Sequence, residues 1–214
     1  MRIAELLQEG EKQLLLCGVR DAAIDVQLLL GHCLKKNRSE LFLHSSDMVD
    51  SSCCNRFLTL IERRAAREPV AYILKEREFW SLPFYVNQDV LIPRPETEFL
   101  LEMVLQQLAQ TKTVVNHCVD LCCGSGVIAV VLARELGCFV TALDYSEKAL
   151  AVTARNSQRH GVDERVTPLH SDVFGALPVD AVFPLIVSNP PYVCSAAIRG
   201  ELDAEVAAFE PHLA

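Results

Sequence analysis

Short apolar runs alternate with helix-like segments in the second half of the chain, and this alternation constrains the fold more than any other feature of the sequence. Strands are predicted over residues 114–121, 138–143, 166–169 and 183–187. Helices are predicted between the first three strands, over 127–136 and 146–160. Strands that alternate with helices form a parallel sheet with crossover helices, so the predicted fold class is α/β and Rossmann-like.

The residues before position 70 have the pattern of a small helical bundle. Apolar residues recur at helical spacing near the N-terminus, and Asp21 is a predicted N-cap for the helix that follows. Ser39 and Ser51 offer two further helix starts, and Pro69 ends the last helix of this region. We therefore expect an α-helical N-terminal domain.

The chain changes character after the bundle. Residues 79–86 are rich in aromatic and β-branched side chains, which favours a hairpin or an extended linker. Pro95 suits the first turn of the next helix. The predicted domains are therefore a helical bundle over 1–75, a hairpin linker over 76–93 and an α/β domain over 94–214.

Composition excludes several classes of protein. The net charge is -8, and no run of Lys or Arg offers a surface for a phosphate backbone, so direct binding of nucleic acid is not expected. No segment reaches the roughly 18 apolar residues that a membrane helix needs. The nine cysteines contain no Cys-x-x-Cys, so we expect neither a metal site nor a redox pair, and thiols within apolar runs predict a reducing, cytoplasmic location.

A glycine-containing loop follows the first predicted strand of the α/β domain. The sequence from Asp120 is Asp-Leu-Cys-Cys-Gly-Ser-Gly, which places Gly124 and Gly126 just before a helix. Glycines permit a close approach of backbone to ligand, and unpaired N–H groups lie at the start of a helix. A Gly-x-Gly turn also serves ordinary tight packing, so the loop alone leaves both interpretations open.

Asp144 ends the second predicted strand, where a carboxylate can accept both ribose hydroxyls of a nucleoside. The alternative is a turn residue or helix cap, although Ser146 already supplies a cap. The loop and Asp144 suit dinucleotides as well as S-adenosylmethionine. The third glycine of a dinucleotide fingerprint is replaced by Ala129, a replacement that some dinucleotide folds also permit.

The segment Asn-Pro-Pro-Tyr after the last predicted strand favours S-adenosylmethionine and methyl transfer to a planar nitrogen. The Asn189 side-chain oxygen and the Pro190 carbonyl can each accept one N–H and so aim the nitrogen lone pair. Pro191 stiffens the backbone, and Tyr192 can stack on the planar group. Asn-Pro and Pro-Pro also occur in ordinary turns, but here they follow a strand and a nucleoside loop.

Asp172, after the third strand, and the six histidines are weaker candidates. Asp172 could contact the adenine amino group of the cofactor, although a loop Asp is more often a cap or turn residue. The histidines have no partners at metal-ligand spacing, so no metal is predicted. The segment from Asn189 to Tyr192 does not by itself separate an adenine amine from a protein amide as the methyl acceptor.

Residues 77–84 and 91–98 resemble the linker of the HemK/PrmC family, the protein-(glutamine N5) methyltransferases that modify class 1 peptide-chain release factors in translation termination. The resemblance covers essentially the whole chain and implies a class I methyltransferase domain. It implies that S-adenosylmethionine is lined by Cys122, Cys123, Gly124, Ser125 and Gly126 and that its ribose is bound by Asp144. It further implies that the segment from Asn189 to Tyr192 holds the substrate glutamine, and that the N-terminal bundle engages the release factor.

The sequence departs from the family at three places. Cys122 and Cys123 replace a Gly and a Thr that relatives commonly carry in the loop. Val173, which we count with Asp172 and Asn189 among the expected cofactor contacts, stands where relatives carry an aromatic residue near adenine. The family also continues beyond Ala214, so we expect the C-terminal strands and part of the pocket wall to be missing, and we expect activity of the full-length protein.

Two other functions are weighed against release factor methylation. An N6-adenine methyltransferase for DNA or RNA would use the same Asn-Pro-Pro-Tyr, but the acidic charge and the linker argue against it. A non-catalytic fragment that only binds a release factor is the second alternative. Because Asn189 is retained, an enzyme is favoured over a fragment that only binds. Separately, we expect the protein to be a monomer.

Overall fold

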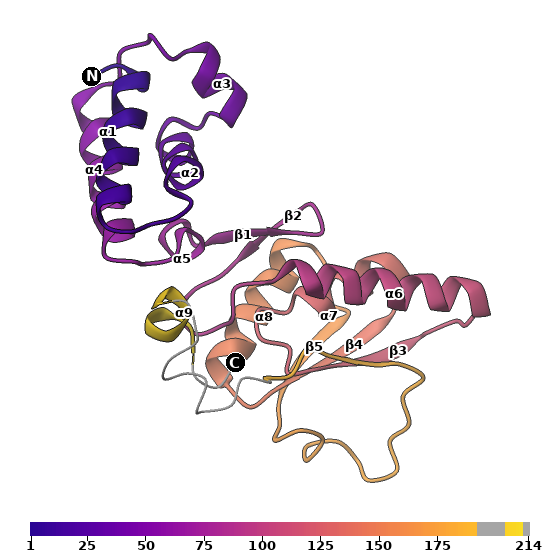
Figure 1. The fold of residues 1–214 in the computed structure, drawn as a ribbon. Helices are drawn as coiled ribbons and strands as arrows, with labels where there is room; N and C mark the ends of the chain where they lie inside the picture. The colour runs from indigo at the N-terminus through magenta and orange to yellow at the C-terminus, as the bar shows by residue number, and fades with distance from the viewer. Residues whose placement is uncertain (192–203, 212–214) are drawn as a thin grey trace. The chain divides into compact units, whose positions relative to one another are not determined.

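The computed structural model describes residues 1–191 and 204–211, which fold as two compact units (Figure 1). The first unit contains Met1–Leu74 together with helix α9 (Ala204–Phe209). The second unit begins at Lys75 and contains the parallel sheet. Within the described ranges, no helix combines the length and the apolar character that spanning a bilayer requires.

The first unit is a helical bundle, as predicted. Before α9, its helices are α1 (Ile3–Leu16), α2 (Ala22–Leu34), α3 (Arg38–Leu43), α4 (Ser51–Ala65) and α5 (Val70–Leu74). Helices α1, α2 and α4 pack against one another. Their contact buries the large side chains of Ile3, Leu6, Leu14, Leu29, Leu30, Phe57 and Ile61. Burial of these apolar side chains stabilises the unit.

The helix caps of the bundle differ from the predicted ones. The side chain of Asp21 makes no capping hydrogen bond. Helix α3 begins before Ser39, because Asn37 and Glu40 form a reciprocal capping box with bonds of 2.9 and 2.7 Å. Helix α4 begins at Ser51, but its cap is Asp50, whose carboxylate accepts a bond from the backbone of Cys53. For α3 and α4, the cap is therefore supplied by the Asn or Asp directly before the helix.

A buried arginine joins α9 to the bundle. The Arg64 side chain lies 2.6 Å from Asp25 and 2.7 Å from Glu205 of α9. Burial of a charge without a partner is costly, so the two carboxylates satisfy the guanidinium group. This contact explains why α9, far away in sequence, belongs to the first unit.

The second unit opens with a β-hairpin, one of the two structures predicted for the aromatic segment. Strand β1 (Glu76–Phe79) pairs antiparallel with β2 (Leu82–Tyr85). Trp80 and Ser81 between them have φ angles of 55° and 54°. Two consecutive positive φ angles are the signature of a type I′ turn, which matches the twist of the two strands.

The sheet of the second unit is parallel, with strand order β5-β4-β3-β6. Its strands are β3 (His117–Leu121), β4 (Phe139–Asp144), β5 (Val166–His170) and β6 (Ile186–Ser188). The helices are α6 (Pro95–Thr111), α7 (Val127–Leu136) and α8 (Glu147–Arg159), and Figure 1 shows all three on one side of the sheet. The α/β fold is confirmed, although β3 and β6 are shorter than the predicted strands.

The strand order creates a switch point beside β3. The chain runs outward from β3 to β4 and β5 and then returns to β6, on the other side of β3. Ligands of open α/β sheets bind at such a reversal, outside the carboxyl ends of the strands. Leu121 of β3 pairs with Ser188 of β6, and the Ser188 hydroxyl donates a hydrogen bond of 2.7 Å to the Leu121 carbonyl. The segments that follow these two residues therefore leave the sheet side by side.

Candidate active site

The loop Cys122–Gly126 joins β3 to α7 at the switch point. Cys122, Gly124 and Gly126 have positive φ angles of 61°, 53° and 77°. A Cβ atom on Gly126 would lie 2.8 Å from a methyl carbon of Thr153, so only glycine fits there. A Cβ atom on Gly124 would meet no atom within 4 Å. The Gly124 side of the loop is thus open, with room for a ligand.

The two cysteines of the loop fit in different ways. Cys122 is half-buried and takes the left-handed backbone conformation that glycine adopts most easily, at a cost of roughly 1 kcal/mol for other residues. Burial raises the pKa of its thiol, and the nearby carboxylates of Asp144 and Asp120 raise it further. Cys123 is buried, with its sulfur 3.4 Å from the Thr153 hydroxyl. Both residues therefore fit, Cys122 at the expense of backbone strain.

Asp144 binds the loop directly. Its Oδ2 accepts a hydrogen bond of 2.8 Å from the Gly124 N–H, and its Oδ1 accepts one of 2.9 Å from the Ser146 N–H. Asp144 is half-buried, and each carboxylate oxygen keeps a second lone pair. The structure therefore brings together the two features that predicted nucleoside binding, the glycine loop and the acidic residue after β4.

Helix α8 also holds the loop, a contribution that the sequence did not reveal. The Thr153 hydroxyl donates to the Gly124 carbonyl at 3.0 Å, and the Asn156 amide donates to the Ser125 carbonyl at 2.8 Å. Asn156 is fully buried and also exchanges two hydrogen bonds with the Tyr85 backbone, of 2.8 and 2.9 Å. Polar side chains three residues apart on a helix share one face, and that spacing was the available signal.

From the sequence alone, no structural or functional role was assigned to Asp120 either. It is fully buried in β3, and its Oδ2 accepts a hydrogen bond of 2.9 Å from the Ala129 N–H. Its Oδ1 has no partner among the described residues. Burial raises the pKa of Asp120 to about 7; the bond from Ala129 opposes this rise, and the charge of Asp144 adds to it. A carboxylate in an otherwise apolar strand was the signal that could have identified it.

Asn189 follows β6 directly, so it lies at the same sheet edge as the loop. Asn189 is half-buried, and its side-chain nitrogen donates a hydrogen bond of 3.1 Å to the hydroxyl of Thr97 at the start of α6. Pro190 and Pro191 are exposed. Tyr192 lies outside the described residues, so its predicted stacking role stays a prediction. The side-chain amide of Asn189 and the two prolines that follow it therefore lie at the sheet edge from which the glycine loop also starts.

The segment after β5 lies next to Asp144. The Ser171 N–H donates to the Asp144 carbonyl at 3.0 Å. Asp172 is exposed, and its carbonyl accepts a turn hydrogen bond from Gly175. Val173 is exposed with a φ of 50°. Asp172 and Val173 therefore lie near the candidate site. Among the described residues, neither makes a hydrogen bond to the loop, and their cofactor contacts stay predictions.

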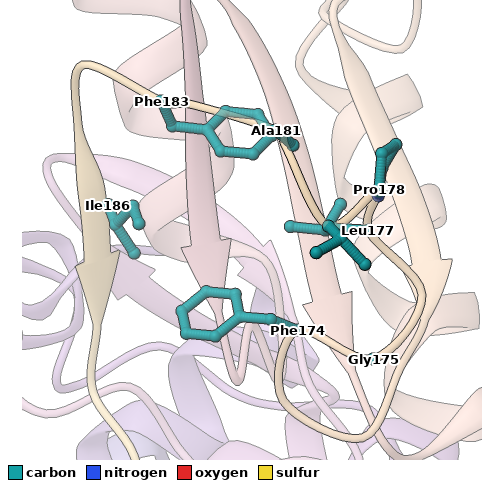
Figure 2. Close-up of a pocket in the computed structure, with 8 residues that line it drawn as sticks. Phe174, Gly175, Leu177, Pro178, Ala181, Phe183 and Ile186 are labelled. Carbon is teal, nitrogen blue, oxygen red and sulfur yellow. The ribbon is translucent and has the colours of Figure 1, made fainter.

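The second unit also has an apolar pocket of about 360 Å³ (Figure 2). It is lined by Phe174, Gly175, Leu177, Pro178, Val179, Ala181, Phe183 and Ile186. None of the predicted cofactor or substrate residues lines it. We place the candidate active site at the switch point, because that is where the glycine loop, Asp144 and Asn189 converge.

Comparison with known proteins identifies the family. The PrmC N-terminal domain matches residues 5–74, and the methyltransferase small domain matches residues 95–208. A release factor glutamine methyltransferase of Nitratidesulfovibrio vulgaris is 38% identical over 210 residues, covering 98% of this chain and 70% of the relative. A release factor glutamine methyltransferase of Cereibacter sphaeroides is 40% identical, covering 100% of this chain and 74% of that relative. The chain belongs to the release factor glutamine methyltransferase family. The resemblance predicted from the linker sequence is confirmed.

Among solved structures, the N-terminal domain of human METTL16 is similar at 14% identity and a TM-score of 0.47, covering 81% of this chain and 66% of that one. This likeness adds nothing to the assignment, which rests on the sequence relatives. As a member of its family, the chain is a methyltransferase whose cofactor is S-adenosylmethionine. The residues fit that cofactor, because the open side of Gly124 leaves space and Asp144 retains acceptor capacity for ribose hydroxyls.

Proposed function

We propose that this chain methylates the side-chain amide nitrogen of a glutamine in a class 1 peptide-chain release factor and so modulates translation termination. The observation that carries the proposal is the position of Asn189 directly beyond Ser188, which is paired with Leu121 at the entry to the glycine loop. The names of the relatives support the release factor as substrate. The same switch point can hold cofactor and acceptor amide together.

Each residue of the site has a distinct part in this proposal. The cofactor supplies an electrophilic methyl group when it is bound. Residues Cys122 to Gly126 and Asp144 hold it, with Asp172 and Val173 beside it. The Asn189 Oδ1 and the Pro190 carbonyl each accept one N–H of the glutamine amide, which turns the nitrogen lone pair outward and favours the positive charge that develops there. Pro191 limits backbone motion, and Tyr192 stacks on the amide.

The decisive experiment incubates the purified protein with methyl-labelled S-adenosylmethionine and, separately, a release factor or a nucleic acid. Label is expected in the release factor, and peptide mass spectrometry should place it on a glutamine. Label on nucleic acid alone would overturn the proposal. Asn189→Ala should lower turnover by at least about a hundredfold, with little effect on cofactor binding.

We assign the first unit to recognition of the release factor, with the predicted boundaries at 1–75, 76–93 and 94–214. The match of residues 5–74 to the PrmC N-terminal domain supports this division. Cross-linking of the release factor during turnover should label peptides of the first unit. Cross-links confined to the second unit would contradict the assignment.

We further propose a cytoplasmic monomer that does not bind nucleic acid. The net charge of -8 supports the absence of nucleic acid contacts. The described cysteines are free thiols, as is typical of a reducing compartment. Light scattering of the purified protein tests the monomer, and a mass of two chains would contradict it.

A further inference from the structure

The amide of Asn189 is anchored by one hydroxyl group. Within residues 1–191 and 204–211, its hydrogen bond to the Thr97 Oγ1, at 3.1 Å, is the one that its side chain makes. Thr97 is 5% exposed, so water has little access to the anchor. Thr97 lies more than ninety positions before Asn189 in the sequence, and α6 brings it to the end of β6.

The orientation of this amide decides what it can do. The oxygen and nitrogen of an Asn side chain occupy nearly equivalent positions, and rotation by half a turn exchanges them. A substrate amide presents N–H groups, so it needs the oxygen of Asn189. A hydroxyl can accept from the amide nitrogen or donate to the amide oxygen. In this structure the Thr97 hydroxyl accepts from the nitrogen of Asn189, which leaves the oxygen for the substrate.

We propose that Thr97 is a positioning residue, which holds the Asn189 amide in the orientation that presents its oxygen to the acceptor nitrogen. This inference rests on the proposed role of Asn189. Thr97 touches neither the cofactor nor the reacting atoms in this scheme, and it acts through Asn189.

Thr97 is itself held in place. It is the third residue of α6, and its N–H donates to the Arg94 carbonyl at 3.0 Å. One nitrogen of the Arg94 guanidinium donates to both oxygens of Glu210, at 2.7 and 2.9 Å, and Glu210 is 7% exposed. Threonine is also branched at Cβ, which restricts its χ1 angle. The Thr97 side chain is therefore held in one position and does not move with the Asn189 amide if that amide rotates.

The experiment compares Thr97→Val with Thr97→Ser. Valine has nearly the volume of threonine but no hydroxyl, whereas serine retains the hydroxyl. Loss of one neutral hydrogen bond should lower kcat by roughly three- to tenfold in Thr97→Val, with the KM for S-adenosylmethionine changed by less than about twofold. Thr97→Ser should restore kcat to within about twofold of the wild type. Thr111→Val, at the exposed end of α6, is the matched control and should leave kcat unchanged.

A second readout does not need turnover. The side-chain NH₂ resonances of Asn189, assigned by comparison with Asn189→Ala, should shift and exchange faster with solvent in Thr97→Val but not in Thr97→Ser. If Thr97→Val is poorly folded, Thr97→Ala replaces it in both measurements. Equal losses in the Val and Ser variants, or none in Val, would refute the positioning role.

The two proposals fail in different ways. If Asn189→Ala loses activity while Thr97→Val does not, the positioning role fails and the proposed function stands. If wild-type protein labels another substrate, the function fails, and the Val and Ser variants are compared on that substrate. In the Asn189→Ala background, Thr97→Val should have no further effect on residual turnover; an additional loss would show that Thr97 does not act through Asn189.

Discussion

The carboxylate of Asp120 caps helix α7 from within the sheet, through its bond of 2.9 Å to the N–H of Ala129. Ala129 is the third residue of α7, where an N-cap side chain ordinarily accepts a hydrogen bond. The N-cap position is occupied by Gly126, which has no side chain, so β3 supplies the cap. The N–H of Ala129 therefore has a hydrogen-bond partner although the N-cap residue is a glycine, and the loop needs no larger capping side chain beside the ligand.

Burial of the Asp120 carboxyl group makes the stability of the fold depend on pH. Because burial raises the Asp120 pKa from 3.8 to about 7, the folded protein holds a proton that the unfolded chain releases in this interval. The free energy of unfolding should therefore fall as pH rises from about 4 to 7. In Asp120→Asn this contribution is absent, since Asn has no proton to lose, and its oxygen can still accept the bond from Ala129.

The measurement is urea denaturation of the wild type and Asp120→Asn at pH 5 and pH 7. The difference in unfolding free energy between the two proteins should shift by about 2 kcal/mol in favour of the variant at the higher pH. Titrating groups that do not interact with Asp120 are common to both proteins and cancel, and the nearby Asp144 carboxylate is a smaller contribution than burial. A difference that is the same at both pH values would contradict the raised pKa.

Asn156 should control the affinity for the cofactor through its hydrogen bond to the Ser125 carbonyl of the loop. Asn156→Ala removes the bond to Ser125 and both bonds to Tyr85, so buried backbone groups lose their partners. We expect about 2–3 kcal/mol of destabilisation and a rise of roughly tenfold in the Kd for S-adenosylmethionine. Thermal unfolding and calorimetric titration measure the two effects.

Gln158→Ala is the control for Asn156, because it removes an exposed amide from the same helix. Both the stability and the Kd of this variant should stay near the wild-type values. If Asn156→Ala binds the cofactor as tightly as Gln158→Ala does, the contact with Ser125 does not hold the loop in its binding conformation.

The sequence was sufficient for the order of elements in the α/β domain, because apolar strands and amphipathic helices have different periods. It was less reliable at their ends. Val114 was assigned to a strand, yet it is 77% exposed and precedes β3, which pairs with its neighbours from His117 onward. Strand pairing is a tertiary property, so local pattern alone could not fix where β3 starts.

The site was predictable where the chain itself places residues at a strand end, as for Gly124, Asp144 and Asn189. Residues that reach the site from another element were missed. Thr97 and Asn156 lie on helices. The spacing of Asn156 from Thr153 was a weak local signal, and nothing local distinguishes Thr97 from other polar residues of its helix. Their roles depend on the packing of α6 and α8, which a single sequence does not specify.

Gly124 should be required for the cofactor rather than for folding. Gly124 and Gly161 have φ angles of 53° and 66°, and a Cβ atom on either would meet nothing within 4 Å. Each substitution by Ala should therefore cost a similar amount of stability, about 1 kcal/mol, from the left-handed backbone alone. Only Gly124→Ala places a methyl group on the open side of the loop, so it alone should weaken cofactor binding. Equal Kd values for the two variants would contradict this assignment.

Asp144 should matter for both loop geometry and cofactor binding. Asp144→Ala removes the acceptor for the N–H groups of Gly124 and Ser146 and any acceptor for ribose hydroxyls. Loss of charge-assisted hydrogen bonds predicts a rise in the cofactor Kd of about ten- to a hundredfold. Asp163→Ala is the control, since Asp163 is an exposed carboxylate to which no part of the site is assigned. Asp163→Ala should leave the Kd unchanged, and an unaltered Kd in Asp144→Ala would exclude Asp144 from the cofactor site.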